Sequence, residues 1–469
     1  MFFSLKADCF FRHYDDIGHI CLSTSNKEEV VDQNGAIFIE QLTYEPQEID
    51  KIVSALLNHF EGVSFAQLKQ DVIAFYLSLC DCGFLYCSEK FPNENTQVAD
   101  SMNFDAEASS SFLVEYFGQH PCLETFHVEL TSRCNERCVH CYIPHEDKLL
   151  DMAPDTMLQA LNQCKELNVM TIIFSGGEPM LHPQFCELLC RAKDLDFNTV
   201  VLSNLTMLND STIDALQYKH PTRVKVSLYS MQADIHDAIT TVPGSWEKSV
   251  QNILRLLESS IPVQINCPVI KQNINSFDEV VQWGKQHHCA VACDYLIMAR
   301  DNFTTDNLDN RLSAEDLKSV IGKIVVGNFL TKRDEMAMEP KRSTMVPSSY
   351  DKRVCGVGIS MLCMESNGDI YPCVGWHKYR CGNIKDSSLL KIWSESPQLN
   401  YLRGIRLKDF KKCANCQDKD YCLMCISRNS NESCDGNIFD IPQITCDAAH
   451  TYRKIIEKYK QENGLSLGE

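Results

Sequence analysis

The sequence predicts an α/β protein in three parts, and three observations support this prediction. Strand-type and helix-type runs alternate between residues 124 and 300, a smaller mixed pattern precedes them, and a cysteine-rich stretch follows them. A length of 469 residues exceeds that of one ordinary domain. The contents of 44% hydrophobic and 23% charged residues are typical of a folded chain with a substantial core.

Residues 1–90 are expected to form a small α+β domain with a winged-helix-like order of elements. Pro46 opens a stretch whose apolar residues keep helical spacing, as proline near a first helical turn often does. The expected elements are strands at 9–12 and 19–22, helices at 36–42, 47–57 and 65–79, and a strand at 83–86. The pattern also fits a generic accessory domain.

Residues 91–121 break this periodicity and are expected to be a linker, because polar clusters such as Pro92–Thr96 and Glu107–Ser111 fall within them. Residues 122–320 form the central part. Its expected strands are 125–130, 170–174, 199–202, 224–228, 263–269 and 291–297, with helices at 154–167, 184–194, 210–217, 246–259 and 276–287. Six strands with intervening helices predict parallel strands joined by right-handed crossovers, in an α/β sheet or open barrel.

A further helix at about 313–326 leads into a connection at 321–350, and residues 351–469 hold an irregular cysteine-rich region with a final helix after Cys446. The net charge of −19 disfavours nucleic acid and anionic membranes as partners. No stretch approaches the ~20 apolar residues of a membrane helix. Because the N-terminus turns charged before a signal peptide could form, we expect a cytoplasmic protein. In a reducing compartment, 25 cysteines indicate metal ligands or core residues rather than disulfides.

The first predicted barrel strand ends in a Cys-x3-Cys-x2-Cys triplet formed by Cys134, Cys138 and Cys141. Three core cysteines on one helix face would show the same spacing. However, the triplet directly follows a strand, its intervening residues are largely polar, and three thiols leave one metal vertex open. This pattern favours a catalytic metal centre or an iron–sulfur cluster over a structural zinc site.

The second strand runs into Ser175, Gly176, Gly177, Glu178 and Pro179. Two glycines allow the backbone to approach a small ligand closely, and the carboxylate is suited to an ammonium group. Because ligands bind at the carboxyl ends of parallel strands, the triplet and this segment are expected to lie in one site.

With these two motifs the sequence resembles the radical S-adenosylmethionine (SAM) superfamily. The resemblance implies a partial (β/α)6 barrel in which Cys134, Cys138 and Cys141 hold a [4Fe–4S] cluster whose fourth iron binds SAM. It also implies that Ser175–Pro179 contacts the methionine amino group, and that one electron from the cluster cleaves SAM to a 5′-deoxyadenosyl radical that removes a substrate hydrogen.

Other residues match the family's SAM contacts less closely. Ser203 and Asn204 end the third strand, where Leu205 departs from the family's usual glycine. Ser227 ends the fourth strand, and His140 stands where the family often has an aromatic residue near the adenine. Core packing is an equally good interpretation of Ser203, Asn204 and Ser227.

The C-terminal region carries a second field of cysteines. Paired Cys-x2-Cys motifs are typical of zinc, but the pairs are separated by only five residues, and at least eight thiols fit two iron–sulfur clusters better. The field resembles the SPASM domain of radical SAM enzymes, including Gly382–Ile384 and Leu389–Trp393. The resemblance implies one [4Fe–4S] cluster on Cys355, Cys363, Cys373 and Cys425, and another on Cys413, Cys416, Cys422 and Cys446.

This field departs from the family at Cys422-x2-Cys425, where three intervening residues are usual, so Cys434 is an alternative ligand and Cys381 a spare. Cys164, Cys186 and Cys190 have helical positions typical of core residues.

Beside these domains, residues 1–90 resemble the leader-peptide recognition element of enzymes that mature ribosomally made peptides. Such elements bind a peptide as an added strand, with 9–12 and 19–22 as candidate edges. The acidic local sequence argues against DNA binding. We therefore expect a radical SAM/SPASM peptide maturase that installs a crosslink, with a cysteine thioether as the expected product, and that receives electrons from a flavodoxin or ferredoxin.

Several alternatives stay open at this point. Carbon–carbon crosslinking, epimerisation and formylglycine formation in sulfatases share the motif pattern, and a zinc-stabilised peptide-binding protein is the non-enzymatic alternative. Tyr229, His236 and Arg300 lie near predicted strand ends or in the loops that follow them, without an assigned role.

Overall fold

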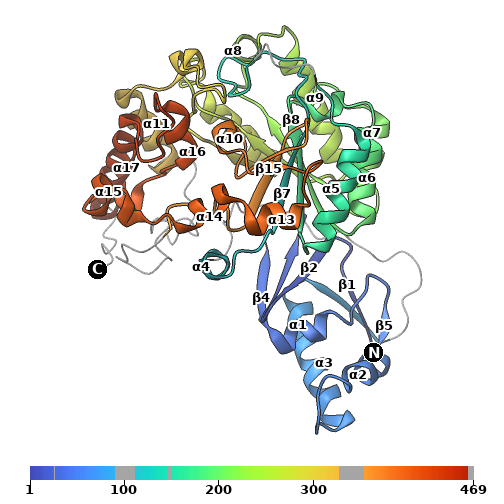
Figure 1. Ribbon diagram of the computed structural model, residues 1–469. Helices are drawn as coiled ribbons and strands as arrows, with labels where there is room; N and C mark the ends of the chain where they lie inside the picture. The colour runs from blue at the N-terminus through green and yellow to red at the C-terminus, as the bar shows by residue number, and fades with distance from the viewer. Residues whose placement is uncertain (26, 90–110, 145–149, 327–352, 463–469) are drawn as a thin grey trace.

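The computed structural model describes residues 1–25, 27–89, 111–144, 150–326 and 353–462. A small N-terminal domain lies below a larger body that contains the central sheet and the C-terminal cysteine region (Figure 1). Most of the predicted linker and of the predicted 321–350 connection falls outside the described residues. Among the residues described, no helix has the length and apolar character needed to cross a membrane.

The N-terminal domain contains the three predicted helices and more strands than expected. Its two antiparallel sheets have the orders β5-β1-β6 and β2-β3-β4. Phe3, Val53 and Tyr76 are fully buried in its own hydrophobic core. In chain order the elements are β1 (Phe2–Leu5), β2 (Cys9–Tyr14), β3 (Ile17–Leu22), β4 (Glu28–Asp32), α1 (Gln33–Ile39), β5 (Gln47–Glu48), α2 (Ile49–Leu56), α3 (Phe65–Asp81) and β6 (Leu85–Ser88).

The C-terminal part of the predicted linker contains the helix α4 (Ser111–Gln119), which the sequence analysis did not expect. The helix forms because Leu113, Tyr116 and Phe117 share one face and bury against Tyr14 and Ile17 of the N-terminal domain. The sequence analysis did not identify this apolar stripe because polar residues precede it.

A nine-stranded sheet forms the centre of the larger body, and six neighbouring parallel strands in it confirm the predicted partial barrel. The order is β12-β11-β10-β9-β8-β7-β13-β14-β15. The six barrel strands are β7 (Thr125–Thr131), β8 (Thr171–Gly176), β9 (Asn198–Ser203), β10 (Arg223–Ser227), β11 (Val263–Asn266) and β12 (Ala290–Ala292). The helices are α5 (Pro154–Glu166), α6 (Phe185–Asp194), α7 (Asp210–Gln217), α8 (Ala233–Thr240), α9 (Ser245–Glu258), α10 (Phe277–Gln286) and α11 (Ala314–Val326).

Side chains alternate along each barrel strand between two environments. On β7, Phe126, Val128 and Leu130 enter the large core shared with the surrounding helices. His127 and Glu129 therefore face the interior of the barrel. The two last strands are shorter than predicted, and α8 was not predicted at all.

The cysteine-rich region is more regular than expected and continues the barrel sheet. Its first strand, β13 (Met361–Met364), pairs in parallel with β7, and Cys363 lies opposite His127. The last helix begins at Gln443, before rather than after Cys446. The remaining elements are β14 (Asp369–Tyr371), β15 (Gly382–Asn383), α13 (Leu389–Glu395), α14 (Pro397–Gly404), α15 (Lys411–Ala414), α16 (Ile426–Glu432) and α17 (Gln443–Glu462).

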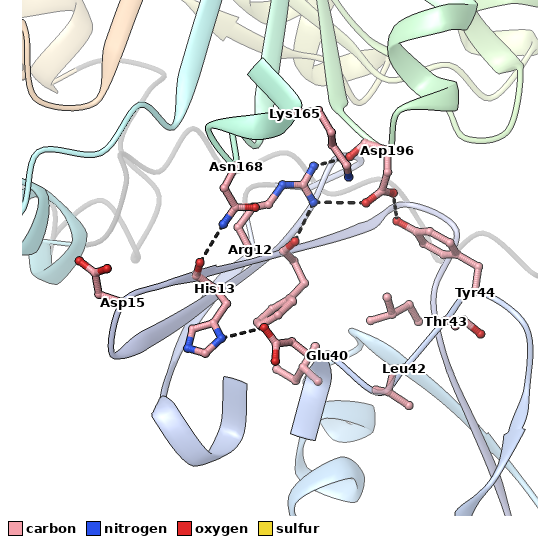
Figure 2. A pocket seen from close by; sticks show the side chains of 13 residues that line it. Arg12, His13, Asp15, Glu40, Leu42, Thr43, Tyr44, Lys165, Asn168 and Asp196 are labelled. Atoms are coloured by element: carbon pink, nitrogen blue, oxygen red, sulfur yellow. Dashed lines mark hydrogen bonds and ion pairs between the residues drawn. The ribbon is translucent and has the colours of Figure 1, made fainter. Parts of the chain in front are cut away.

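Arg12 of β2 anchors the N-terminal domain at the amino ends of the barrel strands. Its guanidinium donates to Val169 O at 3.0 Å. It also donates to Asp196 Oδ2 at 3.2 Å, and Tyr44 Oη donates to the same carboxylate (Figure 2). Arg223 of β10 reaches back to Ser23 O at 2.8 Å. A cavity of about 570 Å³ lies beside this contact. The N-terminal domain thus occupies the end of the barrel opposite the carboxyl ends of its strands.

Two glycines bring the carboxyl ends of β7 and β8 into close contact. A Cβ at Gly176 would lie 2.2 Å from Thr131 O, and a Cβ at Gly177 would lie 2.2 Å from Arg133 O. Gly176 also has φ +118°, which other residues rarely adopt. Gly177 N and Glu178 N donate to Thr131 O and Arg133 O, each at 2.8 Å. The glycines are therefore required by the neighbouring loop of the protein itself, whatever ligand binds there.

The substitution Gly177→Ala is expected to lower the stability of the chain by about 3 kcal/mol or more, because backbone rather than a movable side chain blocks the added methyl. Gly322→Ala is the matched control, since among the described residues no heavy atom outside its own helix lies within 4 Å of the added Cβ. That change should leave the melting temperature unchanged or slightly raised. Equal melting temperatures for the two variants in a thermal unfolding experiment would contradict this account.

Candidate functional site

The cysteine triplet lies in a loop after β7 that is tied to the end of α8. Arg137 N donates to Thr240 O at 3.0 Å, and Val139 N donates to Ile239 O at 3.0 Å. Helix α8, which the sequence analysis missed, therefore fixes the conformation of this loop. Arg300 supports its far end by donating to Cys141 O at 3.0 Å and to Ile143 O at 3.3 Å.

The three thiols of the triplet are neighbours and none is in a disulfide. Burial raises the pKa of the Cys138 thiol well above its usual value, and Glu136 and the Cys141 and Cys134 thiols raise it further. Among the described residues, no three Cys, His, Asp or Glu side chains converge as ligands of a single ion would. A four-iron cluster does not need such convergence, because each thiolate binds a different iron. The donor set therefore fits an iron–sulfur cluster.

Glu178 is fully buried and joins the ends of two strands. Its Oε1 accepts from Met180 N at 3.1 Å and from Ser203 Oγ at 2.8 Å, and its Oε2 accepts from Asn204 N at 2.8 Å. Burial outweighs these bonds and raises the pKa of Glu178 to about 7. Both carboxylate oxygens are thus engaged by the protein, and a carboxylate that accepts three hydrogen bonds still has acceptor capacity for an ammonium group.

Leu205, at the position where a glycine was expected, has φ +65° and is fully buried. Burial in the main core compensates for the unfavourable left-handed backbone, so the departure from the family pattern preserves the turn. Asn204 Nδ2 donates to Asn135 Oδ1 at 2.9 Å, which connects the end of β9 to the triplet loop. These hydrogen bonds hold Ser203 and Asn204 in place at the strand ends.

The other predicted SAM contacts lie in buried or half-buried positions. Ser175 Oγ is hydrogen-bonded to the buried His127 ring, and Pro179 opens a short 3₁₀ helix. His140 is stacked edge-on against Tyr229, with ring centroids 5.0 Å apart. Burial lowers the pKa of His140 to about 4, so its imidazole is neutral near pH 7.

In the C-terminal region, Cys355, Cys363, Cys373 and Cys425 lie near one another. Burial raises the pKa of Cys373 above its usual value, and the neighbouring Cys425 and Cys355 thiols raise it further. Cys363 is fully buried next to Cys373. Cys425 caps α16, where its Sγ accepts from Arg428 N. These four residues are the set that the sequence analysis assigned to one cluster.

Cys413, Cys416, Cys422 and Cys446 form a second group. Burial raises the pKa of Cys413 to about 12, with contributions from the Cys422, Cys416 and Cys446 thiols. Cys422 and Cys425, which have only two residues between them, thus belong to different groups. Cys381, in contrast, is buried in the main core, and Cys434 is exposed.

The sequence analysis missed a polar group between the triplet loop and the first C-terminal cysteine group. Tyr142 Oη donates to Glu129 Oε1 at 3.1 Å, and His377 forms ion pairs with Glu365 and Asp301. Burial, with the nearby Glu365 carboxylate, raises the pKa of Glu129 to about 8. The sequence does contain one indication of this polar group. Glu129 stands at an inward-facing position of β7, a strand whose alternate residues are apolar.

Two family models match the chain. Residues 128–284 match the radical SAM superfamily, and residues 355–417 match the SPASM family, an iron–sulfur cluster-binding domain. Both matched segments contain cysteines of the groups described above.

Curated relatives match about two thirds of the chain. An AdoMet-dependent heme synthase from Methanosarcina barkeri is 24% identical over 64% of this chain and 90% of its own length. The PqqA peptide cyclase of Gluconobacter oxydans is 23% identical over 62% of this chain and 82% of its own length.

Solved structures share the fold at low sequence identity. SuiB of Streptococcus suis, in complex with its precursor peptide SuiA, has a TM-score of 0.62 and 16% identity over 95% of this chain and 100% of its own. The enzyme anSMEcpe with bound AdoMet has a TM-score of 0.56 and 16% identity over 73% of this chain and 94% of its own. With both domain matches in one chain, the protein is an enzyme of the radical SAM type that carries a SPASM iron–sulfur domain.

Proposed function

We propose that this enzyme modifies a ribosomally made precursor peptide and installs a cysteine thioether crosslink. The observation that carries the proposal is the presence in one chain of the triplet loop, two further four-cysteine groups and a separately folded N-terminal domain. Carbon–carbon crosslinking and epimerisation use the same constellation and are the first alternatives.

The assignment of the SAM site follows from the strand ends. Cys134, Cys138 and Cys141 would hold a [4Fe–4S] cluster, and the backbone of Ser175–Pro179 would face the methionine group of SAM. When bound, the cluster supplies one electron and SAM supplies a 5′-deoxyadenosyl radical that removes a substrate hydrogen. Glu178 would position Ser203 and Asn204 at the site, and the neutral His140 ring would lie near the adenine.

Two auxiliary [4Fe–4S] clusters would occupy the C-terminal region. We assign Cys355, Cys363, Cys373 and Cys425 to one and Cys413, Cys416, Cys422 and Cys446 to the other, which gives three clusters per chain. Both groups pack against one apolar cluster that includes Trp376 and Phe410. Such a shell excludes water and is a determinant of reduction potential. A flavodoxin or ferredoxin would supply electrons.

The iron content after anaerobic reconstitution should be ~12 atoms per chain with a similar amount of sulfide, as three four-iron clusters require. Replacement of the triplet by alanine should lower it to ~8, because only the two auxiliary clusters would be left. Cys186→Ala is the matched control, since this cysteine lies on α6 against the main core and should leave the content unchanged. A wild-type content of ~4 iron atoms with tightly bound zinc would contradict the auxiliary-cluster assignment.

The peptide substrate is supported by the names of relatives and by the extent of the structural likeness. The PqqA peptide cyclase acts on a peptide, and SuiB was solved with a precursor peptide. The structural likeness to SuiB spans 95% of this chain and therefore includes the N-terminal domain. The heme synthase and the PqqA peptide cyclase match similar shares of the chain, 64% and 62%, so heme synthesis is the alternative that the sequence matches offer.

Residues 1–90 would bind the leader of the precursor, but the expected edge strands need correction. The run 19–22 belongs to β3, which is the middle strand of its sheet and is paired on both sides. The run 9–12 belongs to β2, whose outward carbonyls at Cys9 and His13 already accept from Tyr44 Oη and Asn168 Nδ2. We therefore propose the outer edge of β4 for strand addition.

The substitution Val30→Pro is expected to weaken leader binding at least tenfold. Leu22 N donates to Lys27 O, and by alternation the N–H of Val30 points away from β3, so proline would remove a donor only from the added strand. Cys87→Pro is the matched control on the outer edge of β6, in the other sheet. Fluorescence anisotropy with the labelled leader of the precursor encoded beside the gene measures the effect. Equal weakening by both prolines would argue against the β4 edge.

A further inference from the structure

The hydroxyl of Tyr229 lies against the middle cysteine of the triplet. Its Oη is 3.7 Å from Cys138 Sγ, in a hydrogen bond in which either atom can be the donor. Tyr229 is 4% exposed and belongs with Cys138 to a small apolar cluster that includes Ile239 and Ile270. The Glu136 carboxyl approaches the same sulfur from its own loop, with Oε2 at 3.4 Å.

Tyr229 is held rigidly on every side. Its backbone N–H donates to His236 Nδ1 at 3.2 Å, and its carbonyl accepts from Asn273 Nδ2 at 2.8 Å. Its ring lies next to His140 and His236, with centroid separations of 5.0 and 5.2 Å. The ring therefore cannot swing away from Cys138 without breaking several buried contacts.

The orientation of the phenol proton follows from its second neighbour. The Ser227 side chain, two residues earlier at the end of β10, is the other polar neighbour of the Tyr229 hydroxyl. When Ser227 donates to the phenol oxygen, the phenol O–H is left to point toward Cys138 Sγ. A hydrogen bond to a thiolate is charge-assisted and stronger than one between neutral groups.

We propose that Tyr229 is a positioning residue that donates a hydrogen bond to the Cys138 thiolate and thereby raises the reduction potential of the cluster held by the triplet. The inference rests on the proposed function, because it requires a cluster on Cys134, Cys138 and Cys141. Reduction adds negative charge to the cluster and its sulfur ligands, so a donor at one sulfur stabilises the reduced state. The reacting atoms of the substrate are not contacted by Tyr229 in this role.

The test is an anaerobic redox titration of the full-length reconstituted enzyme, followed by electron paramagnetic resonance. The signal that changes when SAM is added identifies the cluster of the triplet among the others. Tyr229→Phe keeps the ring and removes the hydroxyl, and it should lower the midpoint potential. At a fixed applied potential, the ratio of reduced to oxidised cluster is expected to fall about tenfold. This corresponds to a midpoint potential lower by about 59 mV for a one-electron couple.

Two further variants distinguish the effect of the hydrogen bond on the potential from the effect of a general loss of packing. Site-specific 3-fluorotyrosine at position 229 is a stronger donor of nearly the same shape, so it should shift the potential in the opposite direction. It also provides the readout if Tyr229→Phe does not fold. Tyr76→Phe is the control, since it removes a buried hydroxyl from the N-terminal domain, where the group donates to Phe38 O at 2.6 Å.

Opposite shifts from phenylalanine and fluorotyrosine, with none from Tyr76→Phe, would support the proposal. Unchanged potentials in both Tyr229 proteins, or shifts of the same sign, would overturn it while leaving the proposed function intact. Absence of a SAM-responsive signal in the unmodified enzyme would overturn the cluster assignment, and the inference would fall with it.

Discussion

The close contact between the carboxyl ends of β7 and β8 is the constraint on which the rest of the site depends. It requires glycine at 176 and 177, because the carbonyls of Thr131 and Arg133 occupy the space of a side chain. The next residue, Glu178, extends the contact to Ser203 and Asn204 of β9. One short segment thereby fixes three strand ends and the loop that carries the cysteine triplet. Chemistry at this edge needs such rigidity, since a small displacement of positioned groups is costly in rate.

The position of the N-terminal domain determines the path that a bound precursor peptide would follow to the triplet loop. Arg12 and Arg223 attach the domain to the amino ends of the barrel strands, whereas the triplet follows the carboxyl end of β7. A leader bound at the β4 edge must therefore be connected to the reacting residues by a stretch of peptide that passes along the outside of the barrel. Helix α4 lies along part of this way, between β4 and the C-terminal region.

Much of this architecture could be predicted from local sequence patterns. The alternation of strands and helices between Thr125 and Ala292 is strongly periodic, and the spacing of the triplet is a local property of the chain. What could not be predicted depends on contacts between distant residues. The pairing of β13 with β7 and the use of Glu178 as a bridge depend on partners elsewhere in the chain. The central place of β3, in contrast, results from a local hairpin with β4, a strand that the sequence analysis did not expect. The grouping of cysteines was predictable only through the family pattern, because spacing alone would have put Cys422 and Cys425 together.

The central claim is that the triplet loop supports reductive cleavage of SAM. Anaerobic incubation of the reconstituted enzyme with SAM and dithionite, with quantification of 5′-deoxyadenosine by liquid chromatography, tests it most directly. We predict 5′-deoxyadenosine formation by the unmodified enzyme and by Cys186→Ala, and loss of it in Cys138→Ala. Equal formation in the enzyme and in Cys138→Ala, or none in the enzyme despite a full iron content, would contradict the account.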